Sequence, residues 1–181
     1  MLKLKSFYRD VLSGLNSMIF EKHSNDDYDK CDLNIINNEG IVDDKILVTD
    51  STFVFFIEKS KFPFDINAVN GRRRIENNAV IKNILNDIDS HSLYEVIEID
   101  YDHSFKLHNG ITNKNEKQEM LIVENTITKH RAFLSMAIMK YFDLNKIHIL
   151  GNDHYKPFLI FNKTKDLKEM EIEAIIMPIL V

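Results

Sequence analysis

The stretch Lys45–Glu58, KILVTDSTFVFFIE, decides the fold because it places two short apolar segments on either side of a polar turn. Each segment has the length and composition of a β-strand. Successive side chains of a strand point to opposite faces, so Phe56 lies on the face opposite to Phe53 and Phe55. A run that is apolar on both faces is typical of a buried strand. We favour this interpretation over a platform on which single-stranded bases stack.

The rest of the chain repeats such segments and interrupts them with stretches whose apolar residues recur at helical spacing. Turns are predicted at Asn38-Glu39-Gly40 and Asn109-Gly110, and Thr126 or Thr128 is the predicted cap of the last helix. We predict helices at residues 6–20, 78–88 and 129–142. We predict strands at residues 2–5, 32–37, 45–49, 53–58, 93–99, 104–107, 120–123, 146–150, 157–161 and 169–177.

These elements form units in which a strand, a helix and two or three further strands follow one another. The units repeat in architecture and not in sequence. We therefore predict an α+β fold of repeated βαββ(β) units, with antiparallel sheets that carry their helices on one face. Residues 1–112 are expected to form a domain of two βαββ units, and residues 113–181 a C-terminal βαβββ unit.

The composition describes a chain with a real core and no structural disulfide. Of its 181 residues, 44% are hydrophobic, which is enough to bury a core, and Cys31 is the single cysteine. The start of the sequence becomes charged at Lys3, too early for a secretory signal, and no run reaches the roughly 18 apolar residues that a membrane helix needs. We expect a soluble, intracellular protein with no membrane contact.

The net charge of −5 conceals separate acidic and basic patches. A polarised molecule presents a local field that matters more to a partner than the sum of its charges. Acidic residues gather at 26–29, 43–44, 95–102 and 169–173, and basic residues gather at 3–9, 72–74 and 129–131.

Two stretches bear a resemblance to a known family. The first is Val48–Ile57, where an Asp and small hydroxyl residues form a turn ahead of an apolar strand. The second is the end of the chain, with apolar segments at 146–150 and 157–161 and the tail Ile175–Val181, which contains Met177-Pro178. Both resemble the sliding clamps, the family of DNA processivity factors that includes proliferating cell nuclear antigen and the bacterial beta clamp. Clamps carry two or three domains of two units each, whereas three units are counted here, so ring closure and subunit number stay open.

The resemblance implies that basic side chains on the helices contact the phosphates of duplex DNA without reading its sequence. The alternative for each is a solvated helix face. The implied DNA-binding residues are Lys5, Arg9, Arg72, Arg73, Arg74, Lys82, Lys129, Arg131 and Lys140. The resemblance also implies a hydrophobic pocket beside the last strand for a DNA polymerase or other replication proteins, with completion of the core as the alternative. The implied partner-binding residues are Leu159, Phe161, Met177, Pro178, Ile179 and Leu180.

Signals for catalysis and for metals are weak. The sequence has no phosphate-binding GxxxxGK[ST] loop, no GxGxxG and no GxSxG motif, so we expect no enzyme and no cofactor. His23 and Cys31 lie among aspartates without paired ligand spacing, and a solvated acidic loop is favoured there. Glu98, Asp100 and Asp102 alternate, and we favour a solvated strand face over a metal site.

The function that these patterns favour is that of a sliding-clamp-like, homo-oligomeric DNA polymerase processivity factor, of viral or mobile-element type. The main alternative is a clamp-fold protein-interaction module or regulator that does not encircle DNA. A third is an accessory factor of late viral transcription.

Overall fold

The computed structural model describes residues 2–13, 34–36, 44–49, 52–62, 79–106, 115–163 and 171–179. Its helices are α1 (Leu4–Ser13), α2 (Ala79–Asn86) and α3 (Met136–Met139), with short 3-10 helices at Lys59–Lys61, Ile88–Ser90 and Leu144–Lys146. Its strands are β1 (Asn34–Ile36), β2 (Lys45–Thr49), β3 (Phe53–Glu58), β4 (Ser92–Lys106), β5 (Asn115–Asn125), β6 (Arg131–Ser135), β7 (Ile147–Gly151), β8 (Phe158–Asn162) and β9 (Ile172–Ile176).

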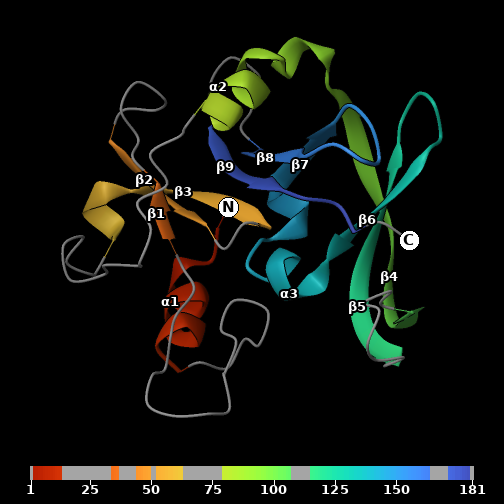
Figure 1. Ribbon diagram of the computed structural model, residues 1–181, viewed down its shortest axis with the longest axis horizontal. Coiled ribbons are helices and arrows are strands. Elements are labelled where there is room, and N and C mark those ends of the chain that lie inside the picture. The colour runs from red at the N-terminus through yellow and green to blue at the C-terminus, as the bar shows by residue number, and fades with distance from the viewer. Residues whose placement is uncertain are drawn as a thin grey trace.

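The described strands form one nine-stranded sheet in the order β1-β2-β3-β9-β8-β7-β4-β5-β6 (Figure 1). Every pairing in it is antiparallel. The sheet consists of three successive meanders, and each follows one helix: α1 precedes β1–β3, α2 precedes β4–β6, and α3 precedes β7–β9. The predicted α+β class with an antiparallel sheet is therefore confirmed.

The stretch from which the prediction started forms the hairpin of β2 and β3, with Lys45 opposite Glu58 and Thr49 opposite Val54. The Thr49 hydroxyl donates a hydrogen bond to the Phe53 carbonyl oxygen across the turn. As predicted, the hairpin is buried on both faces. Phe53 and Phe55 belong to one core cluster and Phe56 belongs to a second.

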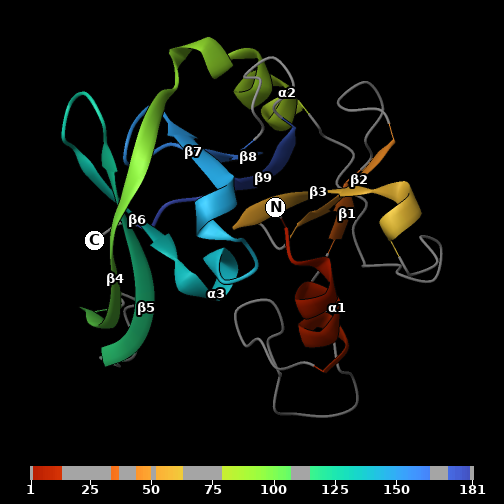
Figure 2. The same ribbon diagram turned by 180° about the vertical axis from the view of Figure 1, so that it is seen from behind.

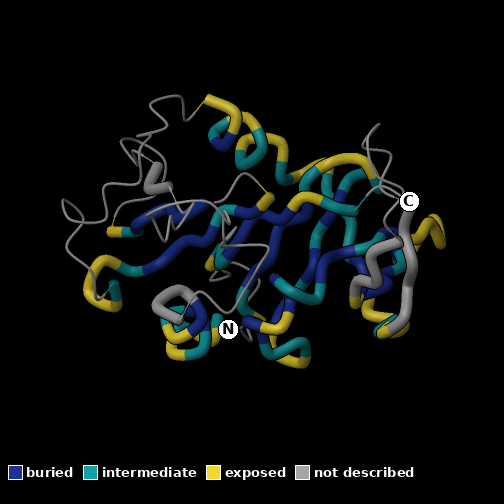
Figure 3. Tube along the Cα trace, turned by 60° about the horizontal axis from the view of Figure 1, so that its bottom comes forward, coloured by how far each residue is buried: buried dark blue, intermediate teal, exposed yellow. Residues whose placement is uncertain are grey.

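The two core clusters lie on opposite faces of the sheet, and a different set of helices covers each. The first receives Phe7 from α1 and Ile138 and Met139 from α3, whereas the second receives Ile81 from α2. Figure 3 shows the buried sheet between α2 and the other two helices. The prediction that the helices share one face is therefore wrong. The amphipathic pattern of a helix requires an apolar partner surface but does not say which face supplies it, and this sheet offers one on each side.

The chain after β9 links two distant parts of the sheet. The Met177 amide donates to the Thr52 carbonyl oxygen and the Ile179 amide to the Phe133 carbonyl oxygen, each over 2.8 Å. Thr52 precedes β3 and Phe133 lies in β6, the last strand in the sheet order. The sheet therefore curves around the first cluster, which holds buried residues from both β3 and β6.

The predicted helix at residues 129–142 is wrong. This segment forms β6 and then the four-residue α3. Ala132 and Leu134 are buried while Arg131 is exposed, which is the two-residue period of a strand pairing with β5. The predicted capping residues instead lie in a turn, in which the Asn125 side chain accepts the amide hydrogens of Ile127 and Thr128, each over 2.9 Å.

The other elements lie close to their predicted positions. Strands predicted at 93–99 and 104–107 are one strand, β4, whose pairing with β5 is interrupted by two register shifts. The first predicted helix is observed as α1, which begins at Leu4, where an edge strand was predicted, and residues 14–20 lie outside the described part. β9, from the predicted C-terminal unit, pairs with β3 from the predicted first domain.

Candidate interaction surfaces

A network of charged side chains ties α1 to the chain after α3. Asp10 is buried at 6% exposure. Its carboxylate accepts a hydrogen bond from the Tyr141 hydroxyl over 3.0 Å and lies 3.1 Å from the Lys140 ammonium and from the Arg9 guanidinium. Beneath it, the rings of Phe7, Phe55 and Tyr141 meet edge to face. We call these residues, with Phe53 and Phe142, the α1 corner.

The α1 corner holds the charge of Asp10 in its ionised form. Burial would raise the pKa of Asp10, but hydrogen bonds from Lys140, Tyr141 and Arg9 outweigh it, and the pKa is lowered. The positive charges of Arg9 and Lys140 are therefore partly neutralised by the buried Asp10 carboxylate. Of the predicted DNA contacts, Lys5 is exposed on the same helix. A phosphate approaching this corner would compete with Asp10 for Arg9 and Lys140.

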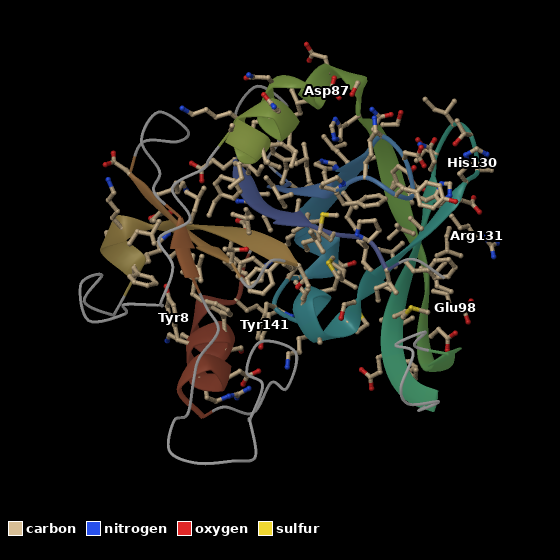
Figure 4. The ribbon with its side chains drawn as sticks, viewed as in Figure 1. Tyr8, Asp87, Glu98, His130, Arg131 and Tyr141 are labelled. Atoms are coloured by element: carbon tan, nitrogen blue, oxygen red, sulfur yellow. The ribbon has the colours of Figure 1, made fainter. Side chains whose placement is uncertain are left out.

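The remaining predicted DNA contacts lie elsewhere. Lys82 is half-buried on α2, across the sheet from α1. Lys129 and Arg131 lie at the β5–β6 turn, where both pair with Glu124, over 3.8 and 3.3 Å. Figure 4 places Arg131 on the opposite side of the molecule from Tyr8 of α1. Arg72, Arg73 and Arg74 lie outside the described residues. The described cations therefore do not form a common wall. The helix that was to carry Lys129, Arg131 and Lys140 is reduced to α3, which contains none of them.

The predicted partner-binding residues fall into two groups. Leu159 and Phe161 are 0% and 5% exposed and belong to the second core cluster, which α2 covers through Ile81. Met177 is 41% exposed, while Pro178 and Ile179 are half-buried. Leu180 lies outside the described residues. Of this set, only the tail reaches the surface, and its amides are bound to Thr52 and Phe133.

The open half of β4 is a surface that the sequence reading did not assign to a partner. β4 pairs with β7 through Ser92, Leu93 and Tyr94 alone. From Glu95 onward its described neighbour is β5 on one side, and among the described residues no strand pairs with the other side. Figure 2 shows β4 and β5 running on together beyond β7. We call Glu95–Ile99, together with Tyr101, the open edge.

The open edge exposes apolar side chains as well as Glu98, whose solvated position agrees with the strand face that was favoured over a metal site. Val96 is 39%, Ile97 47% and Tyr101 66% exposed. The two register shifts of β4 fall at this edge, between Val96 and Glu98 and between Asp100 and His103. A bulge adds a residue to one strand and re-aims its side chains, so the alternation that the sequence suggested does not hold here. No periodic signal marks a bulge, which is why this surface was missed.

A depression of about 400 Å³ lies where β3 and β9 separate. The pairing of the two strands ends at Phe55 opposite Ala174, while β3 continues to Glu58. The Leu2 amide donates to the Glu173 carboxylate at this place, and burial raises the pKa of Glu173. Lys45 lies 3.5 Å from Glu171 and Lys61 2.6 Å from Glu58. Lys3 and Lys5 also line the depression, so both signs of charge meet a ligand there.

Among the described residues, no group of three or more His, Cys, Asp and Glu side chains is arranged to hold a metal ion. None of the helices in the described ranges combines the length and the apolar character needed to span a membrane. No protein-family model matches the chain, and comparisons with curated proteins and with solved structures find no match.

Proposed function

We propose that the chain is a protein-interaction module of sliding-clamp-like architecture that binds a partner protein through the open edge and catalyses no reaction. One observation carries this proposal: β4 leaves its β7 partner after Tyr94 and exposes Val96, Ile97 and Tyr101 along the edge that it opens. An unpaired strand edge with exposed apolar side chains is a template for pairing with another chain, and proteins with no use for such an edge cover or shorten it.

The clamp-like architecture is proposed because of the order of the elements. In the described part of the chain, three helices each precede a three-stranded antiparallel meander, and the three meanders join edge to edge in one sheet. This arrangement supports the repeated units expected from the resemblance. The position of α2 across the sheet from α1 and α3 favours the interaction module over a ring, because a DNA-encircling wall needs its cationic helices on one face.

Site-specific photo-crosslinking tests the proposal. The photoreactive residue p-benzoylphenylalanine would replace Tyr101, and the protein would be irradiated in an extract of the cells that naturally contain it. Val80 is the matched control, since it is an apolar side chain of α2 that is 64% exposed, against 66% for Tyr101. We expect a discrete protein adduct from position 101 and none from position 80. No adduct at 101, or the same adducts at both positions, would contradict the proposal.

Duplex DNA binding by a clamp is the second candidate function. The observation that favours it is the gathering of Lys5, Arg9 and Lys140 on one side, from α1 and from the residue after α3. A clamp of this kind would be a homo-oligomer that docks a DNA polymerase.

Retention on DNA distinguishes the two candidates. A ring is retained on nicked circular DNA and lost when the circle is linearised, and native mass spectrometry finds a closed oligomer. Reversing the charges of Arg72, Arg73 and Arg74 then weakens binding and lowers its salt dependence. The interaction module instead remains monomeric and shows no DNA affinity at low salt.

A further inference from the structure

The open edge is acidic as well as apolar. Between Glu95 and Tyr101 the sequence contains no Lys, Arg or His, and Glu95 and Glu98 are exposed. On the neighbouring strand β5, Glu119 is also exposed. The nearby cations Lys129 and Arg131 are paired with Glu124, which lies opposite Glu95 in the β4–β5 ladder. The surface that a partner meets at this edge therefore carries negative charge.

This charge argues against a second copy of the chain as the occupant. Two copies pairing edge to edge would place the carboxylates of one acidic strand against those of the other. Like charges directly opposite each other destabilise a strand pair. An added strand that carries Lys or Arg would instead form cross-strand ion pairs with Glu95 and Glu98.

The exposed apolar side chains specify the rest of the partner. Val96, Ile97 and Tyr101 need apolar side chains above or beside them to leave water. An extended peptide that alternates basic and apolar residues offers both kinds of side chain, and its backbone offers hydrogen bonds to the strand edge. Strand addition of this kind takes affinity from the main chain and specificity from the alternating side chains.

We infer that the open edge binds a basic, extended peptide segment of a partner protein by adding it as a strand beside β4. This inference rests on the proposed function, because it names the partner class for the same edge. The peptide pairs with the side of β4 that faces away from β5 and places its Lys or Arg side chains against Glu95 and Glu98.

A fluorescent octapeptide of alternating Lys and Val, titrated with the full chain and followed by anisotropy, tests the inference. Two peptide controls accompany it, one with Glu in place of each Lys and one N-methylated on alternate residues, which removes the amides of one peptide edge. We expect saturable binding of the Lys–Val peptide that weakens with salt, no binding of the Glu–Val peptide, and at least about tenfold weaker binding of the methylated one.

A pair of charge-reversal variants tests the position. Glu95→Lys with Glu98→Lys should weaken the Lys–Val peptide about tenfold. The matched control is Asp87→Lys with Asp89→Lys, which changes the net charge equally at exposed positions of the α2–β4 connection. Figure 4 places Asp87 well away from Glu98. The control should leave binding unchanged, and circular dichroism should show both variants folded.

Four results would overturn the inference. Equal binding of the methylated and unmethylated Lys–Val peptides would exclude strand addition. An equal loss of peptide affinity in the two charge-reversal variants would mean that only the net charge of the protein matters. A dimer of the wild-type chain that excludes the peptide would make a second copy the occupant. If the Lys–Val peptide fails to bind while position 101 still crosslinks to a protein, the inference is wrong and the proposed function stands. If the peptide does not bind and position 101 does not crosslink, both the inference and the proposed function are wrong.

Discussion

The α1 corner and the open edge use similar residues in opposite ways. In the corner, Asp10 is buried with three polar partners, and Phe55 is fully buried among aromatic rings. At the open edge, Glu98 and Tyr101 are exposed. A carboxylate and an aromatic ring thus stabilise the fold in the α1 corner, whereas at the open edge the same kinds of side chain are exposed to solvent. Burial and pairing, and not residue type, separate the structural residues from the candidates for binding.

Truncating an aromatic ring in each region should give the largest difference. Phe55→Ala removes a ring that packs against Phe7 at 5.1 Å and Phe53 at 4.2 Å between centroids, and we expect it to lower the free energy of unfolding by about 3–5 kcal/mol. Tyr101→Ala, at an exposed side chain, should change it by less than about 0.5 kcal/mol. Urea unfolding measures both. Equal losses would mean that Tyr101 is packed and that the open edge is covered.

Removing a carboxylate in each region should give the next largest difference. Asp10→Ala leaves the buried Tyr141 hydroxyl without its acceptor and should cost about 2 kcal/mol, whereas Glu98→Ala should cost less than about 0.5 kcal/mol. Tyr141→Phe is the control for the hydrogen bond, with an expected loss of about 1 kcal/mol. A harmless Asp10→Ala would show that the network does not hold α1 in place.

Two carboxyl groups that hold the N-terminal segment should respond to pH with opposite signs. The folded pKa of Asp10 is lowered by its hydrogen bonds, which outweigh burial, so its contribution is present above the unfolded pKa of about 3.9 and is lost as pH falls through the folded value. The folded pKa of Glu173 is raised by burial, so its favourable contribution is present below about 4.3 and is lost as pH rises through the folded value.

Replacing each carboxyl group by an amide of the same shape tests these opposite effects on stability. At pH 7, Asp10→Asn should be less stable than the wild type and Glu173→Gln slightly more stable. Both differences should shrink as the pH is lowered into the range where the wild-type carboxyls are protonated. Thermal unfolding between pH 3 and 7 measures them. A Glu173→Gln variant that is less stable at pH 7 would contradict the assigned effect of burial.

Local pattern predicted much of this fold. β2, β3 and α2 were found from periodicity and composition, because burial on one or both faces leaves a direct trace in the order of apolar residues. The prediction of a helix at residues 129–142 failed because the apolar residues there fit two structures. Ala132, Leu134, Ile138 and Met139 have the spacing of a helix and also that of a strand followed by a helical turn. Pairing with β5 decides between the two structures, and a local pattern of residues does not show which strand is the partner.

The candidate site was harder to predict than the fold. The sequence identified the acidic stretch around Glu98 but could not show where β7 ends, and it is the early loss of β7 that opens the edge. The sequence also identified Lys140 as a cation but not Asp10 as its partner. That contact joins α1 to the chain after α3, as does the hydrogen bond between Tyr141 and Asp10, which are 131 positions apart. Long-range pairing leaves no trace in local periodicity.

Residue-resolved amide hydrogen exchange of the purified chain tests most directly whether the edge is open. Val54 and Phe55 of β3 pair with β2 on one side and with β9 on the other, so both of their amides should be protected. Along Glu95–Ile99, only amides directed toward β5 should be protected, and those directed away from it should exchange rapidly until the basic peptide is added. Uniform protection of Glu95–Ile99 in the chain alone would mean that the edge is already covered, and the account of this surface would be wrong.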